Sequence, residues 1–186
     1  LYNRMKYSKI FSQIIILTSR SKKDDKIIQL CKKKKYKYFR GSLKNVSSRF
    51  YNVCKNNNFD FFLRANADSP LLDINIIKNK IKYIKKFDIV TNCLEKTYPK
   101  GQSIELISKK IFISSFKKFE KKSHMEHVTK YFYENKKMYK IFNFKLKKKL
   151  NNKYNFCIDT KKDLLRIKNI FKKTNLKNLN KTNYSE

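Results

Sequence analysis

The sequence predicts an α/β fold in which helices flank a largely parallel sheet. Short apolar runs typical of strands alternate with segments whose apolar residues recur at helical spacing. The first apolar run, residues 13–18 (QIIILT), shows no polar alternation, which is typical of a strand buried on both faces. The chain has 186 residues, 40% of them hydrophobic, which favours one domain over residues 1–172 with enough apolar residues for a core.

Residues 1–12 resemble the end of a helix, and because the chain starts in mid-pattern without Met we expect an N-terminal truncation. After the strand at 13–18, Asp24 and Asp25 open a helix. Its expected apolar side consists of Ile27, Ile28, Leu30 and Cys31. Residues 36–39 (YKYF) predict a second strand that ends before Gly41.

A helix capped by Ser42 is expected to run to about Asn57. Residues 59–64 (FDFFLR) predict a third strand, and the stretch RANADSP follows at its carboxyl end. Asp73 is then expected to cap another helix. The apolar residues of that helix are Ile76, Ile77, Ile81 and Ile84.

The second half of the chain continues the alternation of strands and helices. The expected elements are a strand at 88–93, an extended piece at 103–107, helices at 108–120 and 124–135, strands at 139–146 and 153–158, and a helix at 161–172. Residues 173–186 are polar and are expected to form a frayed tail.

The formal net charge of +33 allows two interpretations. A basic surface attracts phosphates, so a nucleic-acid-binding domain is one hypothesis. Drift in an A/T-rich genome is the other, because it enriches Lys, Asn, Ile and Phe together. The lysines are spread along the chain and Arg, which usually reads base edges, occurs only at positions 4, 20, 40, 49, 64 and 166. We therefore favour drift.

Small and rigid residues escape this bias in three segments only. All Gly, Pro and Ala residues fall in FRGS (39–42), RANADSP (64–70) and YPKGQ (98–102). These residue types permit tight turns and close approach of a ligand to the backbone. The three segments are therefore candidate ligand-binding loops, against the alternative that they are ordinary turns.

Other motifs point to no special chemistry. The four cysteines form no CxxC pair and are expected to be packed, reduced thiols. His124 and His127 lack the HExxH pattern, so zinc is not favoured. The longest apolar run, at 14–17, is far shorter than a membrane span, and no signal peptide is visible, so we expect a soluble, cytoplasmic protein.

Two acidic residues follow predicted strands. Asp68 comes after the strand at 59–64, and Asp159 ends the strand at 153–158. Ligands of parallel sheets bind at the carboxyl ends of strands, so the two carboxylates are expected to converge on a divalent metal ion. The alternative for each is a helix N-cap.

Several segments, in consistent order over residues 1–171, resemble the cytidylyltransferase family. They are FRGS (39–42) with Arg49, RANADSPLLD (64–73), TYPKGQSIEL (97–106), EHVT (126–129) and IDTKKDL (158–164). The resemblance is greatest to the spore-coat-polysaccharide branch. It implies a Rossmann-like nucleotide-diphospho-sugar transferase fold, transfer of CMP from CTP to a sugar acid such as sialic acid or Kdo, and a homodimer formed through part of 94–147.

The resemblance also implies roles for residues. Asp68 and Asp159 would hold Mg²⁺ and act in catalysis. The residues expected to face the nucleotide are Arg49, Asn66 and Ala67. Those expected on the sugar side are Tyr98, Gly101, Gln102, Glu105 and His127. Arg40 either binds a phosphate or holds a turn.

The sequence departs from the family at several places. Asn66 stands where members often have Thr or Gln, and Lys130 stands where they often have Pro. Ala67 stands where members often have Gly, which keeps the position small. The N-terminal strand and the Gly-, Arg- and Lys-rich loop that cradles the CTP phosphates are missing. The chain is then either a fragment of an active enzyme or a non-catalytic remnant of the family.

Overall fold

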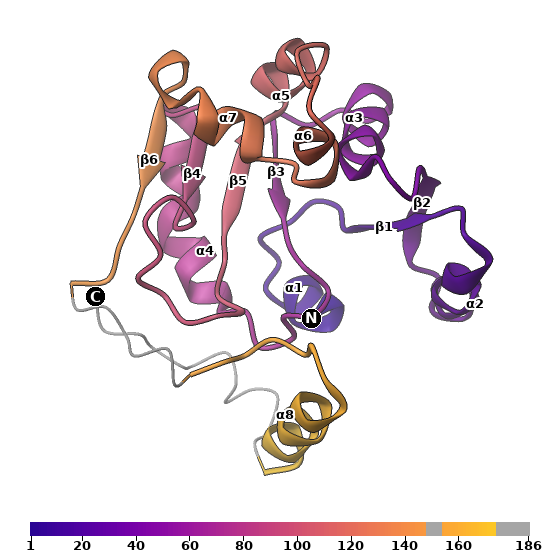
Figure 1. The fold of residues 1–186 in the computed structure, drawn as a ribbon. Helices are drawn as coiled ribbons and strands as arrows, with labels where there is room; N and C mark the ends of the chain where they lie inside the picture. Colours follow the sequence, from indigo (N-terminus) through magenta and orange to yellow (C-terminus); the bar gives the residue numbers. More distant parts are fainter. Residues whose placement is uncertain (148–153, 174–186) are drawn as a thin grey trace. The chain divides into compact units, whose positions relative to one another are not determined.

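The structure is a computed structural model that describes residues 1–147 and 154–173 (Figure 1). Its strands form a two-stranded sheet, β1-β2, and a four-stranded sheet in the order β3-β5-β4-β6. The strands are β1 (Ile15–Ser19), β2 (Lys37–Gly41), β3 (Phe61–Arg64), β4 (Ile89–Thr91), β5 (Glu105–Ser108) and β6 (Ile141–Asn143).

Helices separate most of these strands in the chain. They are α1 (Tyr2–Tyr7), α2 (Asp25–Lys34), α3 (Val46–Asn56), α4 (Ile74–Lys80), α5 (Lys109–Phe116), α6 (Lys122–Glu126), α7 (Lys130–Glu134) and α8 (Lys161–Lys173), with 3₁₀ turns η1 (Lys22–Asp24), η2 (Ile81–Lys85) and η3 (Lys136–Met138). The pairs β1–β2 and β4–β6 are parallel. The predicted α/β class, with parallel pairing and flanking helices, is confirmed.

The chain forms two compact units. Unit 1 comprises residues 1–11, 63–106 and 141–186, and unit 2 comprises residues 12–62 and 107–140. Strands β3 and β5 each contribute residues to both units. The expected division into one domain over 1–172 and a polar tail stays a prediction, and residues 174–186 of that tail lie outside the described residues.

The core of unit 1 forms around β4. Ile89 and Val90 are fully buried, and so is Ile77 of α4, which leads into η2, the turn that contacts β4. The ring of Phe142 in β6 packs at 4.5 Å from that of Tyr83 in η2. All three residues of β4, Ile89, Val90 and Thr91, are buried, so the strand is covered on both sides of its pleat.

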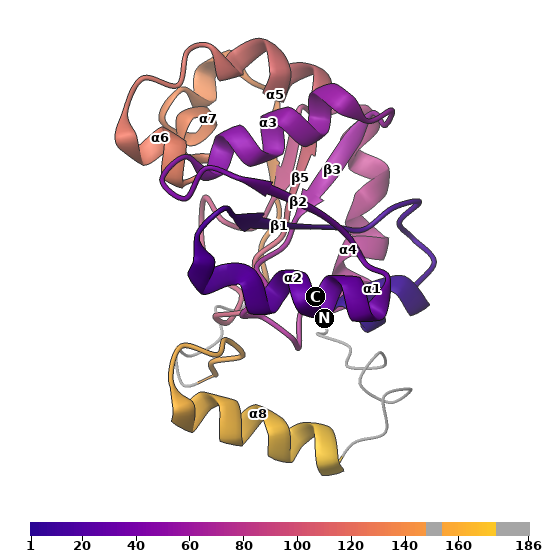
Figure 2. The same cartoon turned by 90° about the vertical axis from the view of Figure 1, so that its right-hand side faces the viewer.

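The core of unit 2 is aromatic. Phe112 of α5 is fully buried and its ring lies within 6.3 Å of the rings of Phe62, Phe116, Phe119 and Phe132. Tyr51 of α3 stacks on Phe116 at 4.2 Å. Large rings bury much apolar area per residue, so a chain with few alanines can still fill its interior. Helix α2 lies alongside β1 and β2 (Figure 2).

Three sequence expectations near β1 need correction. The strand begins at Ile15, and its first three residues are half-buried instead of buried on both faces. In α2 the side chains of Ile27 and Leu30 are 39% and 51% exposed, so only Ile28 and Cys31 form the buried face. The two-stranded sheet offers α2 a narrow surface, and that surface covers one stripe of the helix.

Helix boundaries also differ from the expected ones. Asn45, not Ser42, caps α3, because its Oδ1 accepts a hydrogen bond from the Ser48 amide at 2.8 Å. Ser42 instead accepts from the Asn45 amide and forms the turn before the helix. The expected helix at 124–135 is broken at His127, whose backbone is extended. Asp73 caps α4 as predicted.

The expected strand at 153–158 is wrong for its described residues 154–158. They form only an isolated parallel bridge between Asn155 and Lys100. The amides of Phe156 and Ile158 donate to carbonyls of two different loops, those of Lys100 and Asp68, both at 2.8 Å. The described segment bonds to two separate loops and to no strand, so no continuous ladder forms.

Candidate active site at the Asp68 and Asp159 loops

The structure brings the backbones of the two acidic loops together in unit 1. The amide of Ile158 donates to the carbonyl of Asp68 at 2.8 Å, so Asp159 follows directly on a residue bonded to the Asp68 backbone. Both acidic residues are exposed. The two segments are 91 positions apart in sequence, and this hydrogen bond makes them neighbours.

Neither carboxylate caps a helix. Thr160 caps α8, since its Oγ1 accepts from the amide of Asp163, whose carboxylate in turn accepts from the Thr160 amide at 3.0 Å. Asp73 takes the same role for α4, and Asp68 lies outside that helix. The N-cap interpretation is therefore wrong for both Asp68 and Asp159, and both side chains lie at the surface.

Each carboxylate has a close neighbour. Asp159 Oδ2 pairs with Lys100 Nζ at 2.6 Å, and Asp68 Oδ1 accepts from the hydroxyl of Ser69 at 2.8 Å. Lys100 was not among the predicted site residues, although it lies between Pro99 and Gly101 in one of the segments that escape the compositional bias. That position was the signal that could have identified it.

The loop that carries Lys100 rests on unit 1 through buried polar contacts. Gln102 is 1% exposed, and its side chain accepts from the Asp73 amide at 2.8 Å and donates to the Leu71 carbonyl at 3.0 Å. Gly101 has φ +92°, and a Cβ there would lie 2.7 Å from the carbonyl carbon of Phe156. The missing side chain of Gly101 and the buried side-chain amide of Gln102 thus allow the Lys100 loop to pack against the segments around Leu71 and Phe156.

Two further contacts fix the ends of these segments. Glu105 is buried and pairs with Arg64, the first residue of RANADSP, at 2.5 Å. Arg4 of α1 is 2% exposed and donates to the carbonyl of Pro70 at 2.9 Å. Each end of the loop is therefore held by a buried charged side chain, and a buried charged group is stable only while its polar atoms have partners.

The remaining predicted residues of unit 1 lie at its surface. Asn66 and Ala67 are exposed beside Asp68, and the Asn66 carbonyl accepts from the Ser69 amide at 3.2 Å. Tyr98 is half-buried, with its ring edge-on to Phe144 at 5.7 Å. The contacts of Gly101, Gln102 and Glu105 support the backbone, and the predicted roles of these residues toward a nucleotide or sugar stay predictions.

The predicted arginines belong to unit 2. Arg49 donates to the carbonyls of Ser42 and Leu43 at 2.7 and 3.1 Å, which closes the turn after β2. Arg40 donates to the carbonyl of Ser19 and pairs with Asp25, so the structure supports the turn-holding interpretation of Arg40. The predicted contact of Arg49 with a nucleotide stays a prediction.

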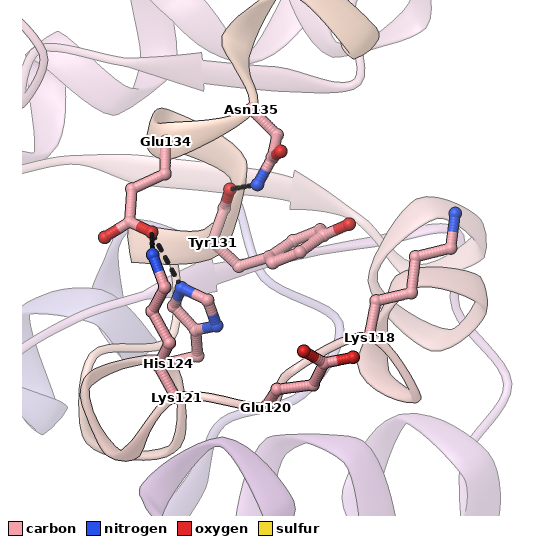
Figure 3. A pocket seen from close by; sticks show the side chains of 7 residues that line it. All are labelled: Lys118, Glu120, Lys121, His124, Tyr131, Glu134 and Asn135. Carbon is pink, nitrogen blue, oxygen red and sulfur yellow. Dashed lines mark hydrogen bonds and ion pairs between the residues drawn. The ribbon is translucent and has the colours of Figure 1, made fainter.

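The two histidines, also in unit 2, differ in environment. His127 is exposed at the end of α6. His124 is buried and its Nε2 lies 2.9 Å from Glu134 Oε2, which also binds Lys121 Nζ at 2.8 Å (Figure 3). The hydrogen bond from Lys121, which has the largest effect, and the one from His124 lower the pKa of Glu134 to about 2. The side chains of His124, Lys121 and Glu134, together with Tyr131, line a cavity of about 470 Å³.

Asp68 and Asp159 place two carboxylates, ligands of the type that a magnesium ion takes, on adjacent surface loops. Mg²⁺ prefers carboxylate oxygens and usually takes one or two of them, with water and substrate phosphates completing the shell. Two exposed carboxylates meet that need, and the Lys100 ammonium already neutralises one of them. Within residues 1–147 and 154–173 no group of three His, Cys, Asp or Glu side chains is arranged to enclose a metal.

The cysteines are packed thiols, as predicted. Cys31, Cys54 and Cys157 are buried and Cys93 is partly buried, and all four are free. Burial raises the pKa of each, that of Cys54 to about 12, which disfavours the reactive thiolate. No helix in the described part of the chain is long and apolar enough to cross a membrane.

Comparison with known proteins identifies the family and two relatives. The sequence pattern of the cytidylyltransferase family matches residues 1–185. An uncharacterized protein of Methanocaldococcus jannaschii is 36% identical over 144 residues, which are 76% of this chain and 58% of that protein. The spore coat polysaccharide biosynthesis protein SpsF of Bacillus subtilis is 26% identical over 171 residues, covering 90% of this chain and 70% of that protein.

Solved structures share the fold. A cytidylyltransferase from Leptospira borgpetersenii superposes with a TM-score of 0.79 at 23% identity, over 99% of this chain and 85% of that one. The bifunctional IspDF of Campylobacter jejuni superposes with a TM-score of 0.59 at 13% identity, over 89% of this chain and 44% of that one. The chain spans somewhat more than half of the length of the Methanocaldococcus jannaschii protein. Because the family pattern matches residues 1–185, the chain belongs to the cytidylyltransferase family.

Proposed function

We propose that this chain carries the metal–nucleotide site of a CTP-dependent nucleotidyltransferase. The substrate is a sugar acid of the sialic acid or Kdo type, and the product serves surface polysaccharide biosynthesis. Family membership supports nucleotidyl transfer, and the similarity to a spore coat polysaccharide biosynthesis protein supports the pathway class. The observation that carries the proposal is the hydrogen bond that joins the Asp159 segment to Asp68.

The chemistry needs positioning and charge neutralisation more than covalent help. A hydroxyl oxygen of the sugar acid attacks the α-phosphorus of CTP. The new O–P bond forms as the bond to pyrophosphate breaks, and the hydroxyl proton leaves to water. Asp68 and Asp159 would hold the Mg²⁺ that neutralises the phosphates, and the small residue Ala67 lets a bulky ligand approach the backbone.

The other roles rest on the same resemblance. Arg49 and Asn66 would contact the nucleotide, and His127 and Tyr98 would face the sugar acid. The protein is expected to be a cytoplasmic homodimer. Sedimentation at several protein concentrations tests the dimer separately from the chemistry.

Metal and nucleotide binding test the proposal without requiring turnover. With Mn²⁺ as the probe, Asp68→Asn and Asp159→Asn should each weaken Mn²⁺ binding in the presence of CTP by about tenfold or more, measured by EPR titration. Asp60→Asn, an exposed aspartate in unit 2, is the matched control and should change nothing. If both site variants bind Mn²⁺ and CTP as the unmodified chain does, the proposed site is wrong.

The competing class has its own signature. A nucleic-acid-binding domain would bind arbitrary DNA tightly in low salt and show no thermal stabilisation by CTP with Mg²⁺. Pyrophosphate release from CTP across a panel of sugar acids then identifies the acceptor.

A further inference from the structure

We propose that Lys100 is a ligand-contacting residue of this site that exchanges partners. In the structure it holds Asp159, and when a divalent ion takes that carboxylate, Lys100 turns to an anionic oxygen of the ligand that arrives with the ion. The inference rests on the proposed function and adds to it a residue and a sequence of events.

The backbone of Lys100 is fixed beside the Asp159 segment. Its carbonyl accepts from the Phe156 amide at 2.8 Å, and the residue forms a parallel bridge with Asn155. The next residue, Gly101, fits only because it lacks a Cβ, which would lie 2.7 Å from the Phe156 carbonyl carbon. The Cα of Lys100 therefore stays in place whatever its side chain contacts.

The side chain, in contrast, is free to change partner. The side chain of Lys100 is 61% exposed and that of Asp159 is 44% exposed, although their charged atoms are only 2.6 Å apart. An exposed ion pair is weak because water and salt screen it, so a competing cation displaces it readily. The Lys100 ammonium thus occupies the place at Asp159 that a bound cation could take, and the pair is not a buried structural ion pair.

A divalent cation at Asp159 competes directly with the ammonium, because both need the same carboxylate. Once displaced, the ammonium stays within a side-chain length of the site because its backbone is anchored. The negative oxygens that accompany the ion are either phosphate oxygens of the nucleotide or the carboxylate of the sugar acid. A compact ammonium with three donors suits either of these anionic oxygens.

The variant Lys100→Met keeps the length of the side chain and removes its charge. It should tighten binding of Mn²⁺ alone by about two- to fivefold, because Asp159 is freed. It should weaken binding of either CTP or a sugar acid in the presence of Mn²⁺, and separate titrations of the two ligands show which anionic oxygen Lys100 contacts. Lys100→Arg keeps the charge and should restore Mn²⁺ binding to the original value.

Lys145→Met is the matched control. Lys145 forms a comparably exposed pair with Glu95 at 2.7 Å in the same unit, away from the acidic loops in sequence. The Lys145→Met variant should leave the binding of Mn²⁺, CTP and the sugar acid unchanged. Asp159→Asn should reduce Mn²⁺ binding whichever residue stands at position 100.

The outcomes separate the two proposals. If Asp159→Asn reduces Mn²⁺ binding while Lys100→Met leaves it unchanged or weakens it, the exchange is wrong and the proposed function stands. If Asp159→Asn has no effect on Mn²⁺ binding, the proposed metal site fails, and the role of Lys100 fails with it.

Discussion

Single residues carry much of the specificity of this chain because its composition is so biased. Gly101 has a backbone conformation that residues with a Cβ rarely adopt, and the space behind it is filled by the backbone at Phe156 and Cys157. Pro70 gives its carbonyl to the buried Arg4. Replacement of either small or rigid residue by the common Lys or Asn would disturb the contacts between the acidic loops.

Gly101→Ala should therefore destabilise the protein by about 2 kcal/mol, because the residue is held at positive φ and its new methyl group meets rigid backbone. The urea midpoint of unfolding measures the effect. Gly41→Ala serves as the comparison, since no positive φ is required there and the new Cβ would meet only side chains, Arg49 Cγ at 2.8 Å and the Phe39 ring at 3.1 Å, where Gly101 faces backbone. Equal midpoints for the two variants would contradict the argument.

At the scale of elements, short helices depend on their ends. Helix α6 has five residues and α7 also has five, too few for either to be stable alone. His124 of α6 and Lys121 beside it both bind Glu134 of α7. The Glu134 carboxylate joins the two helices, and its ion pair with Lys121 exists only while the carboxylate is ionised.

The stability of this tie should depend on pH in the acid range. The hydrogen bonds from Lys121 and His124 lower the pKa of Glu134 from 4.5 to about 2 in the folded state. The carboxylate therefore stabilises the fold above pH 4.5, and its contribution is lost as the pH falls toward 2. Glu134→Gln should lower the urea midpoint at pH 6 and have a smaller effect at pH 2.5.

The control for this pair of measurements is Glu126→Gln, which removes an exposed carboxylate at the end of α6. It should change the midpoint little at either pH. A Glu134→Gln effect that is as large at pH 2.5 as at pH 6 would show that the charge of Glu134 plays no part.

At the scale of the whole molecule, the formal charge of +33 is a cost to folding, because like charges repel most in the compact state. Salt shortens the range of that repulsion, from about 30 Å at 0.01 M to about 8 Å at 0.15 M. Several of the few acidic residues offset part of this repulsion by pairing with a basic side chain, namely Asp25, Glu95, Glu105 and Glu134.

Moderate salt should therefore raise the melting temperature. We expect the temperature to increase between about 0.02 M and about 0.2 M NaCl, a range in which screening dominates over exclusion effects. Sucrose at equal osmolality, which does not screen, is the control and should give a smaller increase. A melting temperature that falls over this range of NaCl would show that favourable ion pairs outweigh the repulsion.

Local signals were enough for much of the fold. The helix at 161–172 and the cap at Asp73 follow from spacing and capping chemistry within a few residues, and both are confirmed. Boundaries that depend on a competing neighbour were not predictable. Asn45 and Ser42 are both good caps, and only the path of the chain into α3 selects Asn45.

The sequence by itself determined the α/β class, because periodicity and capping residues are local properties of the chain. Its motifs also carried the resemblance to the cytidylyltransferase family. Only the tertiary structure decided that the Asp68 and Asp159 segments are neighbours and that Lys100 holds Asp159. These two contacts join residues 90 and 59 positions apart. Their physical cause is the packing of three loops around Gly101, which no local pattern records.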